Sequence, residues 1–341
     1  MMSVIATLST GVMTIDGQTT NQLSSGSVVL SPDAASITAN AVKQAIARLT
    51  TTRPMAGPAA VDREHEAVQV PIFTPPKFTP PKWNWSIHCV QQTSSTNVEL
   101  WQRLANQPEP ESAVALIAHE QTRGKGQWNR AWRSPPGGLY LSAALPLHFT
   151  THEMPVMMLS TACGITSLFR AVGFPIQLKW PNDLVVSGKK LGGILIESRL
   201  RGDRFSRCVV GVGINWMNPM PDNGVSLQSL LTPESARHCR QLSDVGALVL
   251  LGIEAGIDHW KRHGSQSIAH LYNQYLANTH QWVRLPETIG DRYPDCVGLK
   301  GRIVGVAPNG DLIVQVVRPH QALPISITFA PGTIAIGYGQ Q

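Results

Sequence analysis

Residues 179–197 read KWPNDLVVSGKKLGGILIE, and this stretch does most to decide the fold class. It contains the apolar run 184–186 and most of the predicted strand 191–199, and Pro181 interrupts an earlier predicted strand that begins at residue 176. A further apolar run, 208–215, follows without an intervening helix. Strands that succeed one another directly favour a mixed or antiparallel sheet over a doubly wound parallel one.

The flanking segments complete an α+β pattern. Apolar residues at three- and four-residue steps predict helices, and short apolar or alternating runs predict strands. The predicted helices are 96–104, 155–172, 243–264 and 267–278, and the further strands are 86–91, 113–120 and 139–145. The end of the chain predicts a small β-barrel, because short β runs alternate there with turn residues. These runs are 281–285, 300–307, 312–317, 325–329 and 333–336.

The first 82 residues differ in composition from the rest. They are rich in Ser, Thr and Ala and then in Pro, which favours extended, linker-like backbone. One helix is predicted here, because Ala39, Val42, Ile46 and Leu49 form an apolar stripe. We therefore expect a low-complexity or weakly structured extension with a Pro-rich linker (1–82), an α+β domain (83–280) and a β domain (281–341).

Charge and cysteine content restrict the class of protein. The 341 residues carry a formal net charge of +6, which suits an anionic ligand, an acidic partner or nucleic acid. Five scattered cysteines without a CxxC spacing argue against a disulfide framework or zinc site and predict reduced thiols in the cytoplasm. No signal peptide is expected, and charged residues interrupt the apolar stretches 155–174 and 242–257, so no membrane span is predicted.

Two parts of the opening stretch can carry chemistry. Lys190 precedes Gly192 and Gly193, and this pattern suits a carboxylate ligand, because an ammonium is a compact charge and glycines leave room for a ring. Asn182 and Asp183 lie in the predicted turn and could hold ribose, phosphate or a magnesium ion. A β-hairpin with an Asn-Asp turn and a solvent-facing lysine would have the same pattern.

A glycine-rich loop, RGKGQWNRAW at 123–132, follows the predicted strand 113–120. Gly124 and Gly126 allow the backbone to approach an anion closely. The loop also supplies positive charge and flat aromatic faces, from Arg123, Lys125, Arg130, Trp128 and Trp132. Such a loop suits adenylate formation, in which a carboxylate and a phosphate meet. A basic surface turn with two packed tryptophans would have the same sequence pattern.

Two shorter segments offer hydrogen-bonding groups. Ser95-Thr96-Asn97 and Gln121 suit a neutral ring such as a cyclic urea, although a plain helix cap also explains the first segment. Asn215 ends the run Gly211-Val212-Gly213-Ile214, and its amide can both donate to and accept from adenine; a turn asparagine is an equal alternative. The sequence contains no HExxH motif, GxSxG elbow or Walker A loop, so metal-centred hydrolysis is not expected.

These segments, taken together and in this order, resemble the biotin–protein ligase family, also called biotin–[acetyl-CoA-carboxylase] ligases, of the monofunctional type. The pairing of Lys-Trp-Pro-Asn-Asp at 179–183 with Lys-Leu-Gly-Gly at 190–193 is specific to it. The resemblance runs from about residue 83 to the C-terminus and weakens over the β tail. It implies a class II synthetase-like catalytic domain that binds biotin and ATP, followed by an SH3-like β-barrel.

The resemblance also implies the reaction and its residues. Biotin would be activated by ATP and magnesium as biotinyl-5′-AMP and transferred to a lysine of the biotin carboxyl carrier protein of acetyl-CoA carboxylase. The implied catalytic residues are Lys190, Arg130 and Lys125. The implied biotin site comprises Ser95, Thr96, Asn97, Gln121, Gly124, Lys125, Gly126, Gln127, Lys190, Gly192 and Gly193. The implied nucleotide site comprises Arg130, Trp132, Asn182, Asp183 and Asn215, with Asp183 also at the metal.

The chain departs from the family in two places. The family loop usually reads Gly-Arg-Gly-Arg-Arg-Gly-Arg, whereas 124–130 reads GKGQWNR, so Gln127 replaces an arginine that helps to hold the intermediate. The N-terminal region lacks the three helices of a winged helix-turn-helix, so no DNA binding is expected.

Two alternatives stay open at this stage. One is a lipoate or octanoate ligase of related fold, which would need a long apolar slot. The other is a non-catalytic biotin-sensing or DNA-binding regulator. We expect a cytoplasmic enzyme, monomeric or homodimeric, that binds no membrane.

Overall fold

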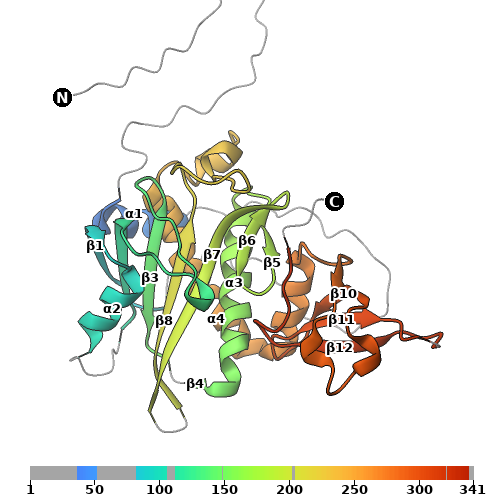
Figure 1. The fold of residues 1–341 in the computed structure, drawn as a ribbon. Helices are drawn as coiled ribbons and strands as arrows, with labels where there is room; N and C mark the ends of the chain where they lie inside the picture. Colours follow the sequence, from blue (N-terminus) through green and yellow to red (C-terminus); the bar gives the residue numbers. More distant parts are fainter. Residues whose placement is uncertain are drawn as a thin grey trace, which may run out of the picture.

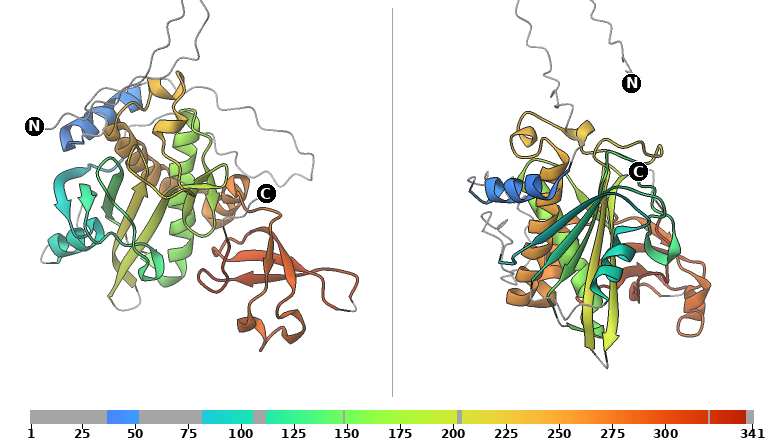
Figure 2. Two further views of the ribbon diagram at one scale, coloured as in Figure 1. Left: turned by 45° about the horizontal axis from the view of Figure 1, so that its top comes forward. Right: turned by 90° about the vertical axis from the view of Figure 1, so that its left-hand side faces the viewer.

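The computed structural model describes residues 37–51, 82–105, 112–147, 149–201, 204–319 and 321–337. These residues form a large mixed sheet flanked by helices and a smaller antiparallel sheet beside it (Figures 1 and 2). Most of the predicted N-terminal extension, 1–36 and 52–81, lies outside the described residues. No helix within the described ranges is both long and apolar enough to span a membrane.

The large sheet has eight strands and confirms the predicted mixed topology. Its hydrogen-bonded order is β1-β2-β3-β8-β7-β6-β5, and β4 pairs with one end of β8. β1 and β2 are parallel, and the other neighbouring strands are antiparallel. The strands are β1 (Ser86–Thr93), β2 (Val114–Gln121), β3 (Leu139–Leu145), β4 (Phe149–Thr150), β5 (Gln177–Lys179), β6 (Asp183–Val186), β7 (Lys189–Arg201) and β8 (Arg204–Ile214).

Helices cover both faces of this sheet, so its central strands are apolar on both sides. Leu116 faces a small cluster with α2 (Thr96–Leu104), whereas its neighbour Ile117 faces the main core with α3 (Met154–Ala171) and α4 (Leu242–Tyr275). This alternation follows from the two-residue period of a strand. Burial on both faces explains why the sequence shows continuous apolar runs here.

Helix α4 is long and changes direction at Gly264. This glycine has φ 79° and ψ 175°, which a residue with a side chain rarely adopts. The break lies at the last residue of the first predicted helix, 243–264, shortly before the second, 267–278. The first part of α4 packs backbone to backbone on α3, because a Cβ at Gly256 would overlap the carbonyl oxygen of Ser160.

Helix α1 (Ala39–Thr51) confirms the predicted apolar stripe and joins the core of the larger domain. Its buried side chains are Val42, Ala45, Ile46 and Leu49. Thr38 Oγ1 accepts a hydrogen bond from Ala41 N at 3.2 Å and so caps its first turn. Arg48 forms an ion pair with Asp244, whose side chain is fully buried and accepts hydrogen bonds from the backbone at the start of α4.

We expect Arg48→Met to lower the free energy of unfolding by about 2 kcal/mol, because it leaves the buried Asp244 carboxylate without its cation. The value is set below that of a fully buried pair because the Arg48 side chain is 36% exposed. Chemical denaturation measures the change. Lys43→Met, on an exposed position of the same helix, is the matched control. Equal losses in the two variants would contradict this role for the ion pair.

The C-terminal sheet has four antiparallel strands in the order β12-β11-β10-β9. They are β9 (Trp282–Arg284), β10 (Lys300–Val306), β11 (Leu312–Val316) and β12 (Ile325–Phe329). The fifth predicted run, 333–336, is not a strand, and that prediction is wrong. Its apolar side chains are buried although its backbone does not join the sheet: Ile334 is buried and Ile336 is packed against the core.

Hydrogen bonds attach this sheet to the larger domain. Trp180 Nε1 donates to the Gly310 carbonyl, in the turn between β10 and β11, at 2.9 Å. Asn273, near the end of α4, donates to the Val306 carbonyl and accepts from the Val306 N–H. The Trp180 side chain therefore reaches the C-terminal sheet from the turn between β5 and β6, which also holds Asn182 and leads into Asp183 of the candidate site.

Candidate active site

A cavity of about 950 Å³ brings together segments that are far apart in the sequence. Its walls come from both the large sheet and the C-terminal part of the chain. The main contributing segments are 95–97, the loop from Lys125 to Arg133, 179–183, 218–224 and 332–336.

One group of side chains in the cavity is neutral and hydrogen-bonded. The backbone N–H of Thr96, in the first turn of α2, donates to Gln121 Oε1 at 2.8 Å, and Gln121 Nε2 donates to Ser134 Oγ at 2.7 Å. Ser142 Oγ, from β3, lies 2.7 Å from Thr96 Oγ1 and also contacts Asn97 Oδ1. These fixed donors and acceptors suit a neutral ring that offers both kinds of group.

Asn97 is held from two further sides. Its Nδ2 donates to Glu197 Oε2 at 2.8 Å. Gly211 on β8 lies directly against it, since a Cβ at Gly211 would overlap Asn97 Oδ1. Ser95 occupies the N-cap position of α2 but makes no capping hydrogen bond through its side chain, so the helix-cap explanation of Ser95 is wrong. Ser95 instead lines the cavity.

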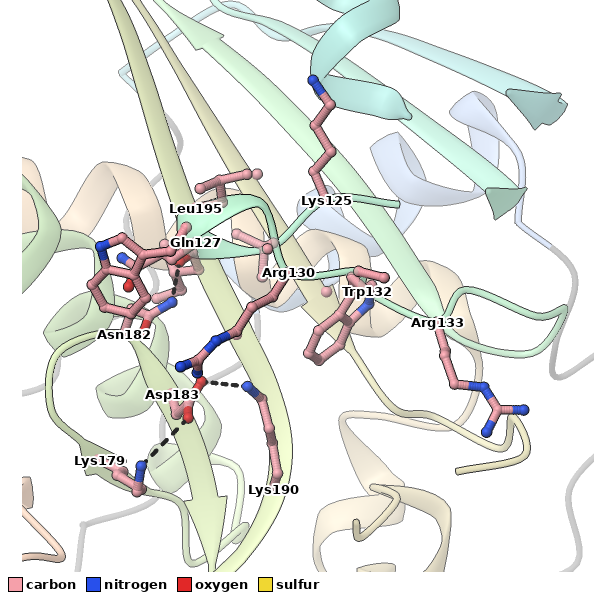
Figure 3. Close-up of a pocket in the computed structure, with 18 of the residues that line it drawn as sticks. Lys125, Gln127, Arg130, Trp132, Arg133, Lys179, Asn182, Asp183, Lys190 and Leu195 are labelled. Atoms are coloured by element: carbon pink, nitrogen blue, oxygen red, sulfur yellow. Dashed lines mark hydrogen bonds and ion pairs between the residues drawn. The ribbon is translucent and has the colours of Figure 1, made fainter. Parts of the chain in front are cut away.

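A second group in the same cavity is charged. Asp183 Oδ1 lies 2.6 Å from Lys190 Nζ, and Asp183 Oδ2 lies 3.9 Å from Lys179 Nζ. Arg130 extends from the glycine-rich loop toward this carboxylate (Figure 3). Asp183 is the only acidic residue among the described residues that line the cavity. Three cations around one carboxylate leave an excess of positive charge, which suits a polyanionic ligand.

Lys179 is the most buried of these cations, with 8% of its surface exposed. It lies directly opposite Asp183 in the β5–β6 ladder. Burial lowers the pKa of Lys179; the Asp183 carboxylate opposes this effect, and the nearby charges of Lys190 and Arg130 add to it. A buried cation next to a single carboxylate and two further cations favours the binding of an additional anion.

Trp132 forms a flat apolar wall beside the charged group. It lies on Gly213, because a Cβ at that position would be 2.6 Å from its indole Cε2. Lys190 Nζ lies 5.2 Å from the centroid of the Trp132 ring. Within the described chain, Trp132 Nε1 and Gln127 Oε1 are buried without a hydrogen-bond partner. Unpaired buried polar atoms are costly, so both are candidates to bind a ligand atom.

The cavity gathers most of the residues predicted from sequence. Those that line it are Ser95, Thr96, Asn97, Gln121, Lys125, Gly126, Gln127, Arg130, Trp132, Asn182, Asp183, Lys190, Gly193 and Asn215. Gly124 and Gly192 are not among the lining residues, and their place in the biotin set stays a prediction. Both permit close packing: a Cβ at Gly192 would be 2.5 Å from the Gly213 carbonyl, and a Cβ at Gly124 would overlap the Trp132 carbonyl.

Two predicted residues have orientations that bear on their roles. The Lys125 side chain points away from the Lys190–Asp183 pair in Figure 3, and its catalytic role stays a prediction. The Asn215 amide is engaged within the protein, donating to the Lys190 and Val225 carbonyls and accepting from Asn218. It thereby fixes the segment that follows β8, and its contact with adenine stays a prediction.

Sequence reasoning missed several lining segments and contacts. Lys179 was visible as the first residue of the Lys-Trp-Pro-Asn-Asp motif but was not assigned to the site. Ser142 had no signal, because a serine inside an apolar strand reads as a small core residue. Segments 218–224 and 332–336 reach the cavity through long-range packing that no local pattern reports.

Comparison with protein families identifies the domain that holds this cavity. Residues 89–215 match the model described as "Biotin/lipoate A/B protein ligase family". These residues form a domain of that family. The ligase domain thus contains the neutral group around Thr96 and the charged group around Asp183, and other parts of the chain complete the cavity.

Characterised relatives of the ligase domain are similar over much of the chain. The bifunctional ligase/repressor BirA of Bacillus spizizenii is 27% identical over 66% of this chain and 68% of its own. The biotin–[acetyl-CoA-carboxylase] ligase of Paracoccus denitrificans is 27% identical over 71% of this chain and 99% of its own. The ligase of that name from Mycobacterium tuberculosis is 29% identical over 66% of this chain and 87% of its own.

A solved structure shares the fold. The biotin protein ligase of Aquifex aeolicus, in complex with biotin and ATP, superposes with a TM-score of 0.54 at 22% identity. The match covers 73% of this chain and 97% of that one. At this identity the likeness concerns the fold: a class II synthetase-like mixed sheet with helices, accompanied by a small C-terminal β domain.

Proposed function

We propose that this chain is an ATP-dependent biotin–protein ligase, which forms biotinyl-5′-AMP and transfers biotin to a lysine of the biotin carboxyl carrier protein of acetyl-CoA carboxylase. The observation that carries the proposal is the composition of the cavity. A neutral hydrogen-bonding group around Thr96 and a cationic group around Asp183 share it. An acid with a polar ring needs the neutral group, a nucleoside triphosphate needs the cationic group, and a reaction between them needs the two groups side by side. The relatives named as biotin ligases support the same activity.

In the first step a carboxylate oxygen of biotin attacks the α-phosphorus of ATP and pyrophosphate leaves. Two anions approach each other, and negative charge accumulates on the phosphate oxygens. Lys190, from β7, and Arg130, from the glycine-rich loop, offset this charge, and Lys179 adds a cation with little solvent screening (Figure 3). Asp183 positions the two lysines before ATP arrives, because it contacts Lys190 and lies beside Lys179.

Magnesium would enter with ATP. No group of three or more His, Cys, Asp or Glu side chains that could hold a metal occurs in the described ranges. Asp183 fits the requirement of magnesium for one or two carboxylates alongside phosphate oxygens, and Asn182 lies next to it. The ion would neutralise phosphate charge, while the lysines and Arg130 do the same from the protein side.

In the second step the neutral amine of a carrier lysine attacks the carbonyl carbon of biotinyl-AMP, and AMP leaves. No covalent bond to the enzyme is needed. The mixed anhydride must meanwhile be kept from water. We expect the enzyme to act in the cytoplasm as a monomer or homodimer, without DNA binding, and to take the carrier protein as its macromolecular partner.

Lys179→Met should lower kcat/KM for ATP about 30-fold, because it removes a poorly screened cation from the phosphate region. Lys189→Met, at an exposed position next to Lys190, should leave kcat/KM for ATP unchanged.

The lowered pKa of Lys179 means that its charge is lost as pH rises through a range where an ordinary lysine stays charged. Lys179→Arg should therefore extend activity to higher pH. A wild-type pH profile in Lys179→Met would contradict this.

The proposed function is tested by incubating the chain with biotin, ATP and an apo carrier domain and weighing the carrier by intact-mass spectrometry. We expect one biotinyl group per carrier, dependent on ATP and absent when the acceptor lysine is replaced by arginine. Lipoate and octanoate serve as competing acids. Modification by lipoate or octanoate in place of biotin would contradict the proposal.

A further inference from the structure

Trp128 joins the glycine-rich loop to the C-terminal segment of the chain. It lies against Gly332, where a Cβ would be 2.9 Å from its indole Nε1 and 3.1 Å from Cε2. Gly332 has φ +91°, a conformation that favours glycine, so the close approach and the backbone both require this residue. Trp128 and segment 332–336 line the same cavity as Lys190 and Asp183.

The loop backbone at this contact is unusual. Trp128 and Asn129 have φ 52° and 58°, in the left-handed region that residues with side chains seldom adopt. Two such residues in succession cost free energy, which surrounding contacts must offset. Packing of the indole on Gly332 is one such contact. Stacking of the Arg130 guanidinium, whose carbon lies 5.6 Å from the Trp128 ring centroid, is another.

The segment on the other side of the contact is anchored. Thr333 Oγ1 donates to the Ala330 carbonyl at 2.7 Å, which closes the turn that presents Gly332. Ile334 is buried in the main core. Trp128 itself is 54% exposed, so it contributes little to the core. The contact therefore fixes a cavity wall and does little for overall stability.

We propose that Trp128 is a positioning residue that docks the glycine-rich loop on the C-terminal segment, so that the reactive acyl-adenylate is retained until the carrier amine arrives. This inference rests on the proposed function. The docked indole closes one side of the cavity and keeps Arg130 directed toward Asp183. The C-terminal segment thus takes part in the site through its backbone at Gly332.

The first test measures the docking without any ligand. In Trp128→Ala, backbone amides in 125–131 and in 331–336 should exchange with deuterium about tenfold faster, because each segment loses its support from the other. Trp282→Ala is the matched control, since Trp282 is also exposed but lies on β9 and does not line the cavity. Unchanged exchange of both segments in Trp128→Ala would overturn the docking, whatever the enzyme's activity.

The second test measures retention. Enzyme carrying newly formed biotinyl-AMP is separated from free ligand, and the bound adenylate is followed over time. Trp128→Ala should shorten its half-life on the order of tenfold, a larger factor than the loss of pyrophosphate exchange that follows from the freed Arg130, and Trp128→Phe should restore most of the half-life. Gly332→Ala alone should also shorten the half-life of the bound adenylate, and it should shorten it little further when combined with Trp128→Ala.

These outcomes separate the two proposals. A wild-type chain that makes no adenylate would overturn the proposed function, while deuterium exchange would still decide the docking. Normal adenylate formation with an unaltered half-life in Trp128→Ala would leave the proposed function intact and overturn the retention role.

Discussion

Lys190→Ala should lower the rate of biotin-dependent pyrophosphate exchange about a thousandfold, the largest loss that we expect from one substitution. Its ammonium is paired with Asp183 at 2.6 Å and lies 5.2 Å from the centroid of the Trp132 ring. Under the proposed function, this fixed ammonium offsets the charge of the carboxylate and the α-phosphate as they meet. Its loss also leaves Asp183 facing both anions with less compensation.

Two variants give this result its meaning. Lys190→Arg keeps the charge but not the compact geometry, and it should retain only part of the activity. Lys189→Ala removes a neighbouring exposed ammonium and should have no effect. Exchange in Lys190→Ala within tenfold of the wild type would show that Lys190 is not the residue that stabilises the reacting charges.

Gly211→Ala should raise the KM for biotin about 100-fold and leave the KM for ATP nearly unchanged. The new methyl group would overlap Asn97 Oδ1 and displace the amide from its contacts with Ser142 and Glu197. A polar site built for several hydrogen bonds loses roughly 2–3 kcal/mol when one buried group is left unpaired. Steady-state exchange kinetics with biotin and with ATP as the varied substrate measure the two constants.

The double variant Gly211→Ala/Asn97→Ala checks the cause. If the clash with Asn97 is responsible, the Gly211→Ala penalty should shrink once the amide is absent. Additive effects of the two substitutions, or an equal rise in the KM for ATP, would show that the clash with Asn97 does not cause the higher KM for biotin.

The sheet could be predicted because each of its main strands has a recognisable pattern of apolar residues in the local sequence. β3 has the predicted bounds, Leu139–Leu145, since a strand buried on both faces is a continuous apolar run. The predicted strand at 333–336 failed for a related reason. Ile334 and Ile336 alternate as in a strand, but they reach the core from an irregular segment. The alternation of apolar residues therefore indicates which side chains are buried, and it does not indicate that the backbone pairs with another strand.

The candidate site was predictable only where its residues form motifs. The segments around Asp183 and Lys190 stood out because lysine, asparagine and glycine are unusual together next to apolar strands. Lys179 was passed over because its burial depends on the β5–β6 register, which brings it opposite Asp183. The contact between Trp128 and Gly332 joins residues more than half the chain apart, and no local pattern could show it.

The central claim is that this cavity activates biotin as an adenylate, and pyrophosphate exchange tests it most directly. Labelled pyrophosphate is supplied with ATP and one acid at a time: biotin, lipoate or octanoate. We predict label in ATP with biotin and none above background with the other two. Exchange with lipoate or octanoate but not biotin, or no exchange with any of the three, would contradict the account.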